Sequence, residues 1–64
     1  MNKERKKRLE KIQDELEEII DEESESRDNL EEHFPCSEKV EQMDTTIDLL
    51  EDVISGIQEI IDNT

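Results

Sequence analysis

The chain has very little of what enzymes use to build active sites. Its 64 residues include no Trp, no Tyr and no Ala, and only one each of Gly, Pro, Cys, His and Phe. Its apolar residues are therefore almost all Ile, Leu and Val, with two Met. Such side chains suit helices that pack through large aliphatic groups, and they leave little for a folded enzyme pocket. We expect a protein that is not an enzyme.

Long apolar stretches and paired cysteines are also missing. No apolar run exceeds two residues, which excludes a transmembrane helix and the apolar part of a signal peptide. A single cysteine excludes an internal disulfide and fits a reducing compartment. These absences predict a soluble, cytoplasmic protein, and the length allows one small domain at most.

Acidic residues dominate what is present. There are 21 Asp and Glu against 8 Lys and Arg, giving a net charge of −13. Six of the basic residues lie in residues 1–11, whereas residues 12–64 hold nineteen acids and two bases. A field of this sign repels nucleic acid and anionic membranes and attracts basic surfaces. We expect no direct nucleic-acid binding, no membrane binding, and a protein partner with a basic or apolar surface.

Apolar residues recur at three- and four-residue spacings, which is typical of helices. In the first half these are Leu9, Ile12, Leu16 and Ile19, with Ile20 beside them. The polar residues 21–29 then allow either one continuous helix or a kink, because Ser and Asn side chains compete for backbone hydrogen bonds. The absence of Gly and Pro there favours the continuous helix.

The rare residues gather in the stretch His33-Phe34-Pro35-Cys36. Pro35 lacks an N–H and disfavours helical angles at the residue before it, so it ends the first helix. Ser37 is a suitable N-cap for a second helix. The expected organisation is one helical hairpin over residues 1–64, with a helix at about 3–33, a turn at 34–37 and a helix at about 38–62.

An antiparallel fold about this turn gives an all-α, coiled-coil-like hairpin. Leu9 then lies opposite Ile61, and Ile20 opposite Leu50. The expected core of the hairpin combines the apolar residues of the first helix with an unbroken stripe on the second. Its members are Leu9, Ile12, Leu16, Ile19, Ile20, Leu30, Val40, Met43, Ile47, Leu50, Ile54, Ile57 and Ile61.

A second apolar stripe runs beside the first on the second helix. It consists of Thr46, Leu49, Val53, Gly56 and Ile60. Two adjacent stripes are wider than one partner helix can cover. We therefore expect self-association, most simply a homodimer that forms a four-helix bundle, with this second stripe at the oligomer interface.

The chain offers few candidates for chemistry. His33 and Cys36 could pair as base and nucleophile, but a tight turn supplies neither an orienting third group nor an oxyanion site. A zinc site there would require the turns of two subunits to meet. The Glu-x-x-His motif of di-iron bundles is absent, because Leu30 stands three residues before His33. We expect no catalytic residue, no metal ligand and no cofactor.

The whole chain resembles a family of small acidic helical-hairpin proteins found in phages, prophages and Gram-positive bacteria. The matching stretches are "MNKERKKRLEKIQDELEEI", Phe34-Pro35, Ser37-Glu38, "IDLLEDVI" and "IQEIID". The resemblance implies a helical hairpin and carries over no functional residue. It also implies a phage-borne accessory protein that acts on a host protein.

These observations favour a non-enzymatic protein–protein interaction protein. In this hypothesis a homo-oligomeric acidic bundle binds and modulates another protein, such as a host or defence protein inhibited by a phage. One alternative is a DNA mimic that blocks a nucleic-acid-binding protein, because carboxylates along a helix can resemble phosphates. Another is a small-ligand sponge at subunit interfaces, for which the acidic charge disfavours anionic ligands except at the basic end.

Overall fold

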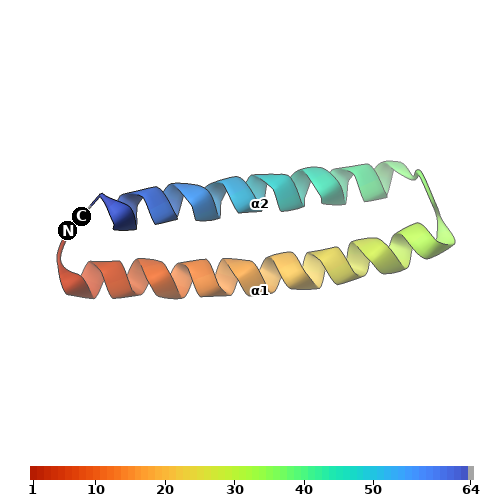
Figure 1. The fold of residues 1–64 in the computed structure, drawn as a ribbon. Coiled ribbons are helices and arrows are strands. Elements are labelled where there is room, and N and C mark those ends of the chain that lie inside the picture. Colours follow the sequence, from red (N-terminus) through yellow and green to blue (C-terminus); the bar gives the residue numbers. More distant parts are fainter. Residues whose placement is uncertain (64) are drawn as a thin grey trace.

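The computed structural model describes residues 1–63, which form a hairpin of two antiparallel helices. Helix α1 spans Lys3–His33 and α2 spans Glu38–Asp62. The two lie side by side, with both termini at one end and the turn at the other (Figure 1). The hairpin measures 47 × 15 × 11 Å over its Cα atoms. The predicted fold class is confirmed: the described residues are all-helical, and the two helices pack against each other.

Side chains just outside the helices define where each one begins. The carboxamide oxygen of Asn2 accepts a hydrogen bond from the backbone N–H of Arg5 at 2.9 Å, which caps α1. The Ser37 hydroxyl accepts one from the N–H of Val40 at 3.2 Å, which caps α2 as its sequence position suggested. Helix α1 is continuous through the polar residues 21–29.

The turn reverses the chain within residues 34–37. The N–H of Phe34 donates to the carbonyl of Leu30 at 2.8 Å, which closes the last turn of α1 before Pro35. Cys36 has a φ of 64°, in the left-handed region that residues with a Cβ rarely adopt. The backbone of this cysteine therefore supplies the change of direction for which glycine or asparagine is the usual choice.

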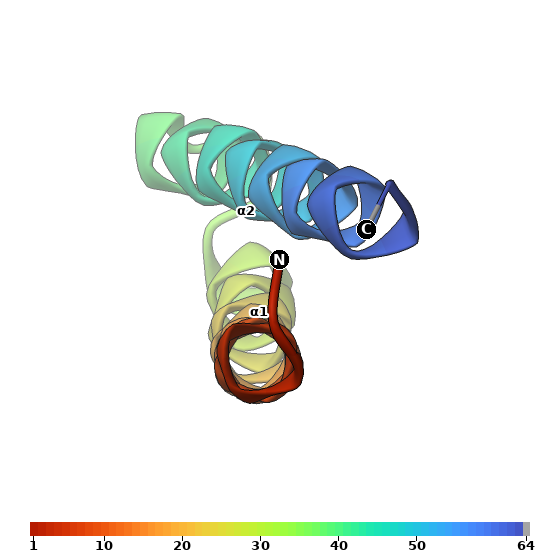
Figure 2. The same cartoon turned by 90° about the vertical axis from the view of Figure 1, so that its left-hand side faces the viewer.

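The contact between the helices uses the expected stripe of α2. Val40 is 5% exposed and is the one buried hydrophobic residue among those described. The rest of the stripe is half-buried against α1: Met43, Ile47, Leu50, Ile54, Ile57 and Ile61. Viewed along its length, the hairpin shows the two helix axes inclined to each other (Figure 2).

The face that α1 turns toward α2 differs from the expected one. Ile12 and Ile19, placed in the hairpin core by the sequence pattern, are 44% and 46% exposed and do not belong to it. The less exposed residues of α1 instead follow a line rotated slightly about the helix axis. Between residues 9 and 31 these are Leu9, Gln13, Leu16, Ile20, Glu23, Ser24, Arg27, Leu30 and Glu31.

Polar contacts across the hairpin accompany this rotation. The Nε2 of Gln13 donates to the carbonyl of Ile54 and to the Oε1 of Gln58, each at 3.2 Å. Arg27 reaches Asp44 with two nitrogens, Nε at 2.7 Å and Nη2 at 3.3 Å. With Ile12 and Ile19 turned inward, these two polar side chains would lie at the edge of the contact instead of on its central line. Both contacts agree with the antiparallel register expected from the sequence.

The cap of α2 gives a test of this local structure. Ser37→Ala removes the acceptor for the Val40 N–H, so it should lower the free energy of unfolding by about 1 kcal/mol. Ser55→Ala is the control, because Ser55 is exposed inside α2 and alanine has the higher helix propensity. Urea unfolding followed by circular dichroism measures both. Equal stability of the two variants would contradict the assigned cap.

Candidate interaction surfaces

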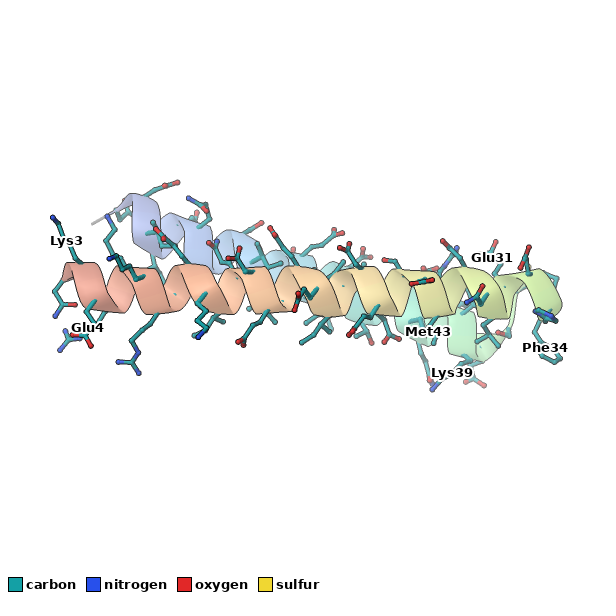
Figure 3. All side chains as sticks on the ribbon, turned by 90° about the horizontal axis from the view of Figure 1, so that it is seen from below. Lys3, Glu4, Glu31, Phe34, Lys39 and Met43 are labelled. Atoms are coloured by element: carbon teal, nitrogen blue, oxygen red, sulfur yellow. The ribbon has the colours of Figure 1, made fainter. Side chains whose placement is uncertain are left out.

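The hairpin has two long sides with different chemistry, and the hollows along it show which residues share each side. Near the turn, Ser26 and His33 of α1 line one hollow together with Lys39 and Met43 of α2. Phe34 lines it too, and it projects on the same side of the molecule as Lys39 (Figure 3). Residues seven apart on packed helices occupy equivalent positions, so this hollow identifies one side along the whole hairpin.

Steps of seven residues from this hollow lead to exposed aliphatic side chains on both helices. They lead back from Ser26 to Ile19 and Ile12, and forward from Lys39 to Thr46, Val53 and Ile60. The neighbouring positions on α2 add Leu49 and Gly56. The aliphatic members are between 44% and 59% exposed. We call this surface the apolar face: Ile12, Ile19, Thr46, Leu49, Val53, Gly56 and Ile60.

The apolar face unites the second stripe of α2 with the two isoleucines that α1 does not bury. The two members that are not aliphatic, Thr46 and Gly56, reduce the apolar character of this face little. The hydroxyl of Thr46 donates to the carbonyl of Gln42 at 3.0 Å, so its hydrogen-bonding proton is already used within α2. A Cβ added at Gly56 would meet no atom within 4 Å, so the helix surface there is open.

Charge is distributed unequally between the two sides. By the seven-residue repeat, the acids that border the apolar face among the described residues are Glu15 and Glu22, both on the outer edge of α1. The bases on this side are Arg5 and Arg8 near the open end and Lys39 near the turn. In a chain with a net charge of −13, this side is close to neutral.

The opposite side carries much of the acidity, and we call it the acidic face. Near its middle, Glu17 and Asp21 of α1 and Glu51 and Ser55 of α2 line one groove together with Ile20 and Ile54. The seven-residue repeat extends this side along both helices. Its acids are Glu10, Asp14, Glu17, Asp21, Asp28, Glu31, Glu41, Asp44, Asp48, Glu51 and Asp62.

An arginine-centred cluster joins the two helices at the border of the acidic face. Besides its two bonds to Asp44, Arg27 pairs with Asp28 through Nη1 at 3.2 Å and with Glu31 one turn further along α1. The hydrogen bonds that Arg27 donates to Asp44 and Asp28 raise its pKa above the ordinary value. The guanidinium therefore stays charged up to strongly alkaline pH. Below that pH, loss of the Arg27 charge does not break the cluster.

The two rare polar residues near the turn do not form a reactive pair. The ring Nδ1 of His33 lies 3.0 Å from the carbonyl of Asn29, to which it donates in the matching tautomer. Cys36 is exposed and free. Within residues 1–63, no three His, Cys, Asp or Glu side chains are grouped so that they could hold a metal ion. Neither helix is apolar enough over a sufficient length to cross a membrane.

Comparison with known proteins adds no relative. No family model, no curated protein and no solved structure matches the chain. The resemblance to phage and prophage hairpins therefore stays a prediction.

The pairing of Arg27 with Asp44 is tested by two substitutions of equal charge. Asp44→Asn should lower the midpoint of thermal unfolding, because Arg27 loses its bidentate partner across the hairpin. Asp48→Asn, at an exposed position on the same helix, should leave the midpoint unchanged or raise it by relieving repulsion.

The pH dependence of this difference follows from the direction of the Arg27 shift. A raised pKa contributes stability that is present below the unfolded-state value and is lost only as the pH rises through the folded one. The gap between the two variants should therefore be constant from about pH 7 to about pH 10. Equal midpoints, or a gap that closes within this range, would contradict the pairing.

Proposed function

We propose that the chain is a non-enzymatic interaction protein: a homo-oligomeric acidic bundle of the cytoplasm that binds a basic surface of another protein. One observation carries this proposal. Its exposed aliphatic side chains lie on one nearly neutral side, while the acids cover the opposite side and the outer surfaces. Such a molecule has one side suited to self-association and a remainder suited to a positively charged partner.

The case for self-association comes from how little a lone hairpin buries. Val40 is the one buried hydrophobic residue described, while five aliphatic residues of the apolar face are at least 44% exposed. Soluble monomers rarely leave such contiguous apolar surface uncovered. Two hairpins that pack through these faces would form a four-helix bundle with a shared core.

The case for a basic partner comes from the charge that such an assembly leaves outside. The acidic face remains accessible, including the groove that Glu17, Asp21 and Glu51 line together with Ile20 and Ile54. An acidic surface of this kind speeds encounter with positively charged proteins and favours lysine and arginine side chains as contacts. The resemblance to phage hairpins supports a bacterial host or defence protein as that partner.

A DNA mimic is the second candidate, favoured by one feature of the acidic face. Its carboxylates form two rows, one along each helix, and the helices run antiparallel side by side. A protein bound across a groove of duplex DNA also faces two rows of negative charge, the phosphates of the two strands. Under this alternative the partner is a nucleic-acid-binding protein, and DNA competes for the same site.

Self-association is tested by sedimentation of the purified protein. We expect a dimer at micromolar concentration, and its dissociation constant should fall as salt rises from about 0.02 M to about 0.2 M, because salt screens the repulsion between two acidic copies. A folded monomer at micromolar concentration under both conditions would contradict the proposal.

Partner binding is tested by affinity capture from a bacterial lysate, followed by purification and titration of the captured protein. The variant Glu17→Gln/Asp21→Asn/Glu51→Gln should weaken binding by roughly threefold to tenfold, as expected for a few exposed charge contacts. The control, Glu18→Gln/Glu25→Gln/Asp52→Asn, makes the same charge change on the outer surfaces and should bind nearly as the parent does.

Salt and DNA separate the remaining possibilities. Binding of the partner should weaken as salt rises, the opposite of the trend for self-association. Competition by duplex DNA would identify a DNA mimic, whereas a partner without DNA affinity would identify a general acidic interaction protein. Equal affinity of both triple variants would contradict the acidic face as the binding site.

A further inference from the structure

We propose that two copies pack through their apolar faces with the two turns at the same end, so that α1 of each copy lies against α2 of the other. This inference rests on the self-association proposed above. It adds to that proposal the face, the contribution of α1 and the orientation of the two copies.

The interface includes α1 as well as the second stripe of α2. The bonds from Gln13 to Gln58 and Ile54 set the antiparallel register, which places Ile12 beside Ile60 and Ile19 beside Val53. The exposed side chains of the two helices therefore form one surface. A contact that used α2 alone would leave both isoleucines of α1, at 44% and 46% exposure, in water.

A second copy is the occupant that the charge distribution favours. Each copy has a net charge of −13, so contacts through the acidic face or the outer surfaces bring like charges together. The apolar face is the side on which two copies can approach with little repulsion. A second hairpin also matches the apolar face in length, because both copies are 47 Å long.

Two symmetric arrangements bring such faces together, and the edge of α1 distinguishes them. With the turns at opposite ends, α1 packs on α1, and Glu15 and Glu22 of one copy meet Glu22 and Glu15 of the other. With the turns at the same end, the edge of α1 meets the edge of α2. That edge carries Gln42, Leu49, Gly56 and Asn63, and no acid. Avoidance of four apposed carboxylates selects the second arrangement.

The ends of the helices favour the same arrangement. The last turn of α2 contains no basic residue, although carboxylates and the negative end of the helix dipole meet there. With the turns together, the edge bearing Arg8 in one copy lies beside the last turn of α2 in the other. With the turns apart, that edge lies beside the end of α1 near Asn29 instead.

The native cysteine provides a direct measurement of the orientation. Cys36 is exposed, lies in the turn and is the one cysteine of the chain, so a nitroxide label attaches there without any substitution. Strong dipolar broadening of the continuous-wave spectrum should show a separation of about 10–20 Å in the labelled dimer, because helix axes in a bundle pack about 8–10 Å apart. Double electron–electron resonance on the same sample covers the longer distances. A distance near the 47 Å length of the hairpin would overturn the orientation while leaving self-association intact.

Charge substitutions test the face. Leu49→Glu and Ile19→Glu place a carboxylate on the apolar face, one on each helix, and each should raise the dissociation constant of the dimer at least tenfold. Thr45→Glu makes the same charge change at an exposed position on the outer surface of α2 and should leave it within about threefold.

The outcomes separate the failures. A parent protein that sediments as a monomer would defeat the proposed function together with this inference. A dimer that tolerates Ile19→Glu as well as Thr45→Glu would defeat the face alone, because α1 would then lie outside the contact.

Discussion

Two helices packed side by side can enclose only a single line of side chains between them, and this constraint governs the rest of the structure. Val40 is the one buried hydrophobic residue described, and the other members of the α2 stripe are half-buried. The line is not even fully apolar, since Gln13 and Arg27 occupy positions on it. The hairpin therefore has a defined register but a thin core, and its apolar face lies exposed on one side.

Segregation of charge is the second consequence. A chain with 21 acidic residues must expose most of its carboxylates, yet a side chain buried between two copies cannot remain charged and unpaired at low cost. The seven-residue repeat resolves this conflict. It keeps acids away from the apolar face of both helices and concentrates them on the acidic face and the outer surfaces. In the assembly that we propose, the same pattern would leave an acidic exterior accessible to a partner.

Local chemistry predicted much of the fold. Pro35 and Ser37 mark where one helix ends and the next begins, and the regular stripe of α2 indicates which of its faces turns inward. The face of α1 was not predictable in the same way. Ile12 stands next to Gln13 and Ile19 next to Ile20, so apolarity alone does not decide between two faces a small rotation apart. The observed face is the one that brings Gln13 and Arg27 to partners on α2, and these contacts exist only once the helices have paired.

The candidate surface was predictable only in part, for the same reason. The second stripe of α2 follows from spacing within one helix, whereas its union with Ile12 and Ile19 depends on the side on which each helix presents its exposed residues. The left-handed backbone at Cys36 had no signal in the residue type, because cysteine has no preference for that region. The sequence alone predicted the two helices, but it did not determine which faces they turn toward each other.

We propose that the hairpin is half of a structure that is complete only when its apolar face is covered. The most direct test is the midpoint of thermal unfolding, followed by circular dichroism, over about a hundredfold range of protein concentration. Because assembly and folding are coupled in this account, the midpoint should rise steadily with concentration. A midpoint independent of concentration, with full helicity at the lowest value, would show that the hairpin is stable alone and would contradict it.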